Sequence, residues 1–325
     1  MFDLRLADIA DWVRSKKFRS VAIQLPEGLK PRATEVADII MNEGASAVIL
    51  GDPCYGACDV KINFKDIADG LVHIGHSPIP SMGQSDDILF VEASAHIDIK
   101  EGTEKIAHLL PDNIGLLSTV QYISALQDVK EVLERSGKKV YIGSADGRMK
   151  YPGQVLGCNC SAASSVADRV DCFLYIGEGM FHPLAAAFGV GKEIKAFNPL
   201  TCELQSMNET RDRVLRKRFA MTENSKDADI FAVIVSSKPG QRRDAVADDI
   251  IEKISKAGKK AYKVMMEEIR PDALLAYKAD AYVCTACPRL VMDDSPQYAR
   301  PMLTPPEAEI ALGLRRWEDY IFDSF

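Results

Sequence analysis

Residues 47–59 read AVILGDPCYGACD. The first four are apolar and end at Gly51, a pattern that is consistent with a short buried strand. The rest is predicted to be a loop, and it carries two thiols, Cys54 and Cys58, among small residues and one aromatic. In parallel sheets, ligands lie beyond the carboxyl ends of the strands. The stretch therefore predicts a parallel sheet with a functional loop at its edge.

The order of elements around this loop recurs twice more along the chain. Each copy starts with a strand, continues with a helix and a second strand, and adds a third and a fourth strand. The predicted strands are residues 21–25, 47–50, 71–74 and 88–91 in the first copy, 114–118, 139–143, 173–176 and 195–199 in the second, and 230–235, 260–265, 281–283 and 300–305 in the third. Ser124 and Gln127 have the spacing of a capping box at the start of the second helix.

Each strand–helix–strand step is expected to be a right-handed crossover between parallel strands. We therefore predict an α/β protein of three repeated βαβ-type domains, each a small parallel sheet flanked by helices. The predicted domains are residues 1–107, 108–210 and 211–325, and each carries one cysteine-bearing loop. We expect the three loops to meet at the centre of the molecule.

The composition excludes several classes of protein. Hydrophobic residues make up 47% and charged residues 27% of the 325 residues, which is an ordinary globular balance. No apolar run reaches the ~18 residues of a membrane span, and the first residues do not resemble a signal peptide. The net charge of −7 argues against direct binding of nucleic acid. We expect a cytoplasmic protein without a membrane contact, in which the basic run 211–218 is a solvated helix face or a docking patch for an acidic partner.

Eight cysteines in an intracellular protein do not indicate a disulfide framework. Six of them fall into three close pairs, one pair in each predicted domain. The pairs are Cys54 and Cys58, Cys158 and Cys160, and Cys284 and Cys287. The two remaining thiols, Cys172 and Cys202, are interpreted as small buried hydrophobic residues.

Three kinds of chemistry fit paired thiols. Structural zinc favours two C-x₂-C pairs, and only Cys284 and Cys287 have that spacing. A thioredoxin-type redox pair normally opens a helix, whereas Pro288 directly follows Cys287. An iron–sulfur cluster accepts thiolates from distant loops. With one thiolate from each domain, a four-iron cluster would keep one iron open to a substrate.

Three short motifs together carry a family resemblance. Residues 55–59 (YGACD), 153–158 (GQVLGC) and 286–289 (ACPR) resemble the diphthamide synthases of archaea, the 2-(3-amino-3-carboxypropyl)histidine synthases. The resemblance covers nearly the whole chain. It implies a homodimer in which Cys58, Cys158 and Cys287 hold a [4Fe–4S] cluster. Their neighbours Cys54, Cys160 and Cys284 fall outside the part of the motifs that can be transferred; each is interpreted as a small loop residue, a spare ligand or a thiol that helps to load the cluster.

The resemblance also implies a reaction. One electron from the reduced cluster breaks the bond between the sulfur and the γ-carbon of S-adenosylmethionine, which acts as substrate. The resulting 3-amino-3-carboxypropyl radical adds to a histidine of translation elongation factor 2, the first step of diphthamide biosynthesis. The reductant is unidentified, and no catalytic residue beyond the cluster is predicted. The alternative hypothesis is a non-catalytic, zinc-binding three-domain interaction protein.

Polar residues on the predicted loops are candidates for binding S-adenosylmethionine. Each of them has a second interpretation as a side chain that braces its loop. The candidates are Gln24, His76, Gln154, Lys238, Gln241 and Arg289.

Overall fold

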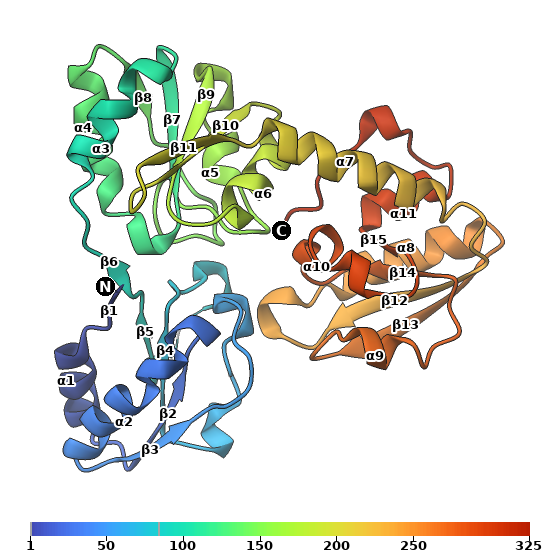
Figure 1. The fold of residues 1–325 in the computed structure, drawn as a ribbon. Coiled ribbons are helices and arrows are strands. Elements are labelled where there is room, and N and C mark those ends of the chain that lie inside the picture. The colour runs from blue at the N-terminus through green and yellow to red at the C-terminus, as the bar shows by residue number, and fades with distance from the viewer. Residues whose placement is uncertain (1, 84) are drawn as a thin grey trace. The chain divides into compact units, whose positions relative to one another are not determined.

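The computed structural model describes residues 2–83 and 85–325. Three sheets dominate the fold (Figure 1). Most neighbouring strands within them are parallel. A two-stranded antiparallel ribbon joins β1 (Phe2–Asp3) to β6 (Ser94–Ala95). The predicted α/β fold class is therefore confirmed. None of the helices in the described part of the chain is long and apolar enough to cross a membrane.

The first sheet has the strand order β3-β2-β4-β5. Its strands are β2 (Ser20–Gln24), β3 (Ser46–Ile49), β4 (Gly70–Ile74) and β5 (Ile88–Val91). The helices of this region are α1 (Leu6–Lys16) and α2 (Ala33–Asn42). Strand residues alternate between the two faces of the sheet, so that Val21 and Ile23 pack with the helices while Ala22 packs with Phe64. Burial of each such aliphatic side chain stabilises the fold by about 1.5–3 kcal/mol.

The second sheet repeats this order and adds one strand, giving β8-β7-β9-β10-β11. Its strands are β7 (Asn113–Ser118), β8 (Lys139–Tyr141), β9 (Cys172–Ile176), β10 (Glu193–Asn198) and β11 (Glu203–Ser206). The helices in this part of the sequence are α3 (Lys100–Ile106), α4 (Ala125–Arg135), α5 (Ser161–Ser164) and α6 (Phe181–Val190).

The third sheet has the same order again, β13-β12-β14-β15. Its strands are β12 (Ile230–Ser236), β13 (Lys260–Met266), β14 (Ala281–Cys284) and β15 (Met302–Leu303). The helices are α7 (Asn208–Glu223), α8 (Asp244–Lys256), α9 (Pro271–Leu274), α10 (Pro288–Met292) and α11 (Pro305–Ala311). In all three sheets the first strand therefore lies between the second and the third.

Each sheet has an aspartate that accepts hydrogen bonds from the backbone at the start of its first strand. Asp69 accepts hydrogen bonds from the backbone N–H groups of Arg19 and Ser20, at the start of β2. Asp171 accepts one from Asn113 at the start of β7, and Asp280 accepts two at the start of β12. Because these residues come just before the third strand, each one ties the beginning of the third strand to the beginning of the first. The threefold repeat thus extends to a side-chain contact.

The compact parts of the chain do not follow the repeats. Residues up to Val155 form unit 1 together with Ser161–Gly179 and Ala196–Leu204, and the remaining described residues form unit 2. The loop that carries Cys158 and the helix α6 therefore belong with the third sheet. The boundaries 1–107, 108–210 and 211–325 stay a prediction.

Four local expectations are wrong. Ser124 precedes α4 but its side chain makes no capping hydrogen bond. The predicted strand 300–305 is only Met302–Leu303, because Thr304 caps α11 in a capping box with Glu307. Cys202 is exposed, and its backbone has a φ of 58°.

The fourth concerns the basic run 211–218, which is only partly a solvated face. Arg213, Arg216 and Lys217 are exposed, but Arg218 is buried and paired with Glu307.

Candidate functional site

The three predicted cluster ligands differ in exposure from most other cysteines. Cys58, Cys158 and Cys287 are partly exposed. Their sequence neighbours Cys54, Cys160 and Cys284 are buried, as is Cys172. The exposure of each cysteine is set within its own loop. The ligand set Cys58, Cys158 and Cys287 stays a prediction.

The loop that carries Cys58 is fixed to the end of β2. Gln24 donates a hydrogen bond from its Nε2 to the carbonyl of Asp59 (2.8 Å), and its Oε1 accepts one from the backbone N–H of Lys61 (3.1 Å). Gly56 keeps this loop narrow, since a Cβ there would lie 3.3 Å from the Cys58 sulfur. The predicted site residue Gln24 therefore braces the residues that follow Cys58.

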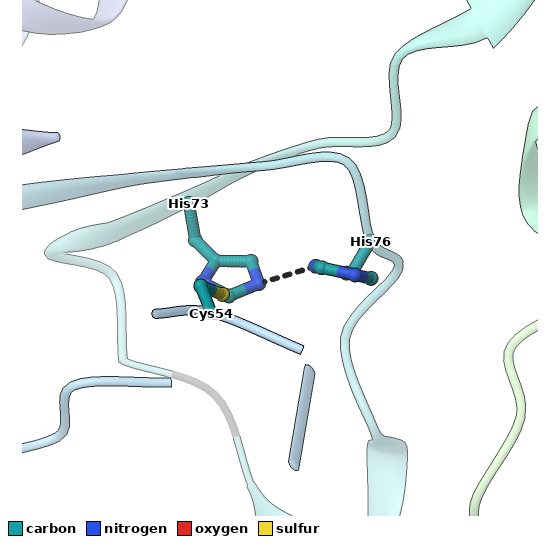
Figure 2. A group of neighbouring side chains, drawn as sticks. All are labelled: Cys54, His73 and His76. Atoms are coloured by element: carbon teal, nitrogen blue, oxygen red, sulfur yellow. Dashed lines mark hydrogen bonds between the residues drawn. The ribbon is translucent and has the colours of Figure 1, made fainter. Parts of the chain in front are cut away.

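A buried histidine continues this network. His73 on β4 places its Nδ1 2.9 Å from Gln24 Oε1, and its Nε2 3.0 Å from the Nδ1 of His76 (Figure 2). The ring of Phe90 packs against His73 with the ring centres 5.1 Å apart. Desolvation lowers the pKa of His76 to about 4 and lowers the pKa of His73 as well, so that both rings are neutral near pH 7.

Gln154 reaches the same end of β4 from the second sheet. Its Nε2 donates to the hydroxyl of Ser77 (2.8 Å), next to His76, while its Oε1 accepts from the backbone N–H groups of Lys150 and Tyr151. Three of the six polar candidates, Gln24, His76 and Gln154, thus gather around the carboxyl end of β4 in unit 1.

The loop that carries Cys158 is a tight turn in unit 2. Leu156 and Asn159 exchange backbone hydrogen bonds, which places Cys158 near its tip. The carbonyl of Cys158 accepts from the N–H of Phe325 (2.9 Å), and Asn159 Nδ2 donates to the Phe325 carbonyl (2.8 Å). The guanidinium of Arg243 lies over the Phe325 ring, 4.6 Å from its centre. The final residues of the chain therefore hold this loop in place.

The loop that carries Cys287 leaves β14 and opens α10. Cys287 stands at the start of this helix with Pro288 in its first position, where a missing N–H costs nothing. Cys284 is fully buried, and burial raises its thiol pKa to about 12. Its Sγ lies 3.9 Å from the Cys287 carbonyl. Cys284 therefore stays a neutral thiol that supports the loop.

Arg289 connects the loops of Cys158 and Cys287. Its guanidinium stacks on the ring of Phe181, 3.3 Å from the ring centre, and its Nη1 donates to the Phe181 carbonyl (2.9 Å). Its Nη2 pairs with Asp293. A Cβ on Gly157 would meet both Phe181 and Arg289, so the glycine before Cys158 lets the two loops touch. The Nε of Arg289 is buried and has no hydrogen-bond partner among the described residues.

The last two candidates follow β12. Lys238 is buried and its Nζ lies 2.5 Å from a carboxylate oxygen of Glu268. Gln241 is buried in the same turn, and its N–H donates to the Lys238 carbonyl. The loop therefore presents an ion pair and an amide.

Two residues near these loops are not among the residues predicted for the site. His73 lies in the predicted strand 71–74, and a histidine inside such an apolar run, three residues before a second histidine, is itself a signal. Phe181 had no signal, because its importance depends on a cation–π contact with a residue 108 positions away.

Parallel sheets of βαβ units with partly exposed thiols on the loops define this chain as an α/β protein with a candidate metal centre. Residues 25–321 match the model of a family described as "Putative diphthamide synthesis protein", and the chain belongs to this family. The resemblance inferred from the three short motifs is thereby confirmed.

Individual relatives cover most of the chain. It is 38% identical over 310 residues to the 2-(3-amino-3-carboxypropyl)histidine synthase of Pyrococcus horikoshii, covering 94% of this chain and 88% of that protein. The enzyme of the same name from Methanocaldococcus jannaschii is 30% identical, with 92% and 86% covered. A crystal structure of Dph2 from Pyrococcus horikoshii with a 4Fe-4S cluster superimposes with a TM-score of 0.90 at 36% identity, covering 100% of this chain and 94% of that one.

Proposed function

We propose that this chain is a 2-(3-amino-3-carboxypropyl)histidine synthase. It would transfer the 3-amino-3-carboxypropyl group of S-adenosylmethionine to a histidine of translation elongation factor 2 by a radical mechanism. The observation that carries the proposal is the match along nearly the full length of named synthases, in sequence and in fold. Partly exposed cysteines on loops of all three repeats support it.

Cys58, Cys158 and Cys287 are proposed to hold a [4Fe–4S] cluster. The donor set fits, because thiolates are the ligands such clusters use and these three cysteines are partly exposed. When bound, the cluster supplies the electron that cleaves the bond between the sulfur and the γ-carbon of S-adenosylmethionine. The chain's own contribution is to hold the thiols: Gln24 braces the loop of Cys58, and Arg289 with Phe181 joins the loops of the other two.

The polar candidates remain proposals for binding S-adenosylmethionine. The buried, unpartnered Nε of Arg289 is a donor that a substrate carboxylate would satisfy. Gln24 and Gln154 already use both ends of their amides in bracing contacts, so their effect on substrate would be indirect. His76, Lys238 and Gln241 keep their place as candidates from the sequence.

The remaining partners are inferred from the family. We propose a cytoplasmic location, because the protein substrate is the elongation factor of the translation machinery. We also propose a homodimer, which the family resemblance implies. An unidentified reductant must supply the electron.

Product analysis tests the proposal. The full chain, purified anaerobically, reduced with dithionite and given S-adenosylmethionine, should release methylthioadenosine and no 5′-deoxyadenosine. Added elongation factor 2 should gain the mass of one 3-amino-3-carboxypropyl group on a histidine. A protein that contains neither iron nor sulfide and releases no methylthioadenosine would overturn the proposal and favour the non-catalytic, zinc-binding alternative.

A further inference from the structure

Cys54, His73 and His76 converge in unit 1, and none of them is among the ligands proposed for the cluster. Figure 2 shows the three side chains together. The sulfur and one nitrogen from each ring lie within 4.8 Å of one another. Cys54 comes from the loop after β3, His73 from β4 and His76 from the turn that follows β4. Cys54 and His73 are 2% and 0% exposed. A thiol and two imidazoles that face each other in a buried place are a metal-ligand set.

Gln24 determines which nitrogen of His73 is available. The backbone N–H of Lys61 donates to Gln24 Oε1, and the Gln24 Nε2 donates to a carbonyl, so the orientation of the amide is fixed. The Oε1 is then an acceptor, and His73 must carry its proton on Nδ1 to donate to it. The Nε2 of His73 therefore presents a lone pair toward His76. A ligating histidine typically has its other nitrogen bound to such an acceptor.

The geometry points to a bound ion, and we propose that Cys54, His73 and His76 bind one divalent transition metal ion of the zinc type. Two nitrogens that share a tetrahedral zinc at bonds of about 2.0–2.1 Å lie roughly 3.3 Å apart. His73 Nε2 and His76 Nδ1 are 3.0 Å apart, so a shift of a few tenths of an ångström replaces their hydrogen bond by two bonds to the ion. Thiolate and imidazole ligands select zinc or iron over magnesium or calcium.

Three protein ligands leave a fourth position, and His76 is partly exposed, so water or a small ligand can reach it.

The site includes Cys54 from the loop that carries Cys58, and Gln24 links His73 to the same loop a second time. The ion would bind His73, and His73 is hydrogen-bonded to Gln24. Gln24 is in turn hydrogen-bonded to the backbone of Asp59 and of Lys61. The ion is therefore placed to order residues 54–61, which begin with its own ligand Cys54. This positioning role rests on the proposed function, whereas metal binding itself does not.

Native mass spectrometry of the full-length protein tests the proposal. The anaerobically purified chain should carry the mass of one zinc ion in addition to any cluster. Cys54→Ser should lose the zinc and keep the cluster mass, whereas the exposed Cys202→Ser should keep both. A chain in which Cys58, Cys158 and Cys287 are all replaced by Ala should keep the zinc. Zinc that is absent from the unmutated chain, that survives Cys54→Ser, or that disappears with the three cluster thiols would overturn the proposal.

Cobalt gives a second readout in the variant without the three cluster thiols. One equivalent of Co²⁺ should produce a thiolate-to-cobalt charge-transfer band, and Cys54→Ser should abolish the band while the far-ultraviolet circular dichroism stays unchanged. His76→Gln should weaken cobalt binding, and Gln24→Met, which removes the acceptor for His73, should weaken it about 10- to 100-fold. Gain of a thiolate band that is insensitive to all three replacements would also contradict the assignment. Zinc binding without any iron or sulfide would support this site and refute the proposed function, so the two outcomes are separable.

Discussion

Arg218 on α7 and Glu307 on α11 form a two-pronged ion pair in which the side chains are 2% and 0% exposed. Arg218 Nε donates to Oε1 (2.8 Å) and Nη2 donates to Oε2 (2.6 Å). Nη1 donates to the carbonyl of Val291, and Nη2 donates also to the carbonyl of Met302. Glu307 also accepts from the N–H of Thr304, so one carboxylate caps α11 and anchors α7.

Arg218→Met should destabilise unit 2. Loss of one partner from a buried pair leaves an uncompensated charge, which typically costs about 3–5 kcal/mol. The free energy of unfolding in urea measures the effect. Arg216→Met on the exposed face of the same helix should change it by less than about 0.5 kcal/mol. Arg218→Met combined with Glu307→Leu should recover part of the loss, and a double variant less stable than the single one would contradict the explanation.

Single replacement of Cys58, Cys158 or Cys287 by Ala should remove the cluster and the activity. Each change deletes one of the three proposed thiolates, and the remaining two do not suffice for a stable cluster. Iron and sulfide content, the absorbance near 400 nm and methylthioadenosine release are the measurements. Cys202→Ala, at an exposed thiol, is the matched control and should behave like the unmutated protein. If Cys160→Ala or Cys284→Ala abolished the cluster while one of the three did not, the ligand assignment would be wrong.

Gly157→Ala should disturb the contact between the loops of Cys158 and Cys287. Its Cβ would lie 2.3 Å from Phe181 Cε1, so the ring must leave the Arg289 guanidinium. The lost cation–π contact and the displaced loop should cost about 1–2 kcal/mol and lower the iron content. Gly28→Ala, where the new Cβ meets nothing within 4 Å, is the control and should be neutral or slightly stabilising. Equal iron content in both variants would show that this contact does not support the cluster.

Asp69→Asn should lower stability in a pH-dependent way. The N–H groups of Arg19 and Ser20 hold the pKa of the Asp69 carboxyl below its ordinary value. A lowered folded-state pKa means that the carboxylate stabilises the fold above its ordinary pKa of about 3.9, and that this contribution is lost as the pH falls through the folded-state value. The difference in urea midpoint between the variant and the unmutated chain should therefore be larger at pH 7 than near pH 3. Asp66→Asn, at an exposed position nearby, serves as control. A difference that is the same at both pH values would exclude the carboxylate charge as the cause.

Much of the fold was predictable because its signals are local. The apolar runs of 21–25 and 71–74 correspond to β2 and β4 within a residue or two, and repetition of the pattern predicted three sheets of one kind. The residues that cap the helices were predicted less accurately. Ser124 has the right neighbours in sequence but helical backbone angles, whereas Thr304 is extended and caps α11 although it was assigned to a strand.

The site was only partly predictable, for the same physical reason. Motifs identify which cysteines belong to the family pattern, but the support for each loop comes from residues far away in sequence. Gln24 reaches Asp59 across 35 positions and Gln154 reaches Ser77 across 77. Such contacts depend on which strands are neighbours, and a single sequence does not specify side-chain partners at that range.

The arrangement around Phe181 also limits how this chain can be divided. A fragment that begins at residue 211 would contain Arg289 but lack the ring and carbonyl on which it rests, together with the Ala185 side that packs against Met292 and Phe322. Such a fragment would expose apolar surface and should aggregate when expressed alone. A chimera between two relatives should therefore take residues 156–160, 180–195 and 205–325 from one parent. In this chain the unit of exchange is a set of three segments.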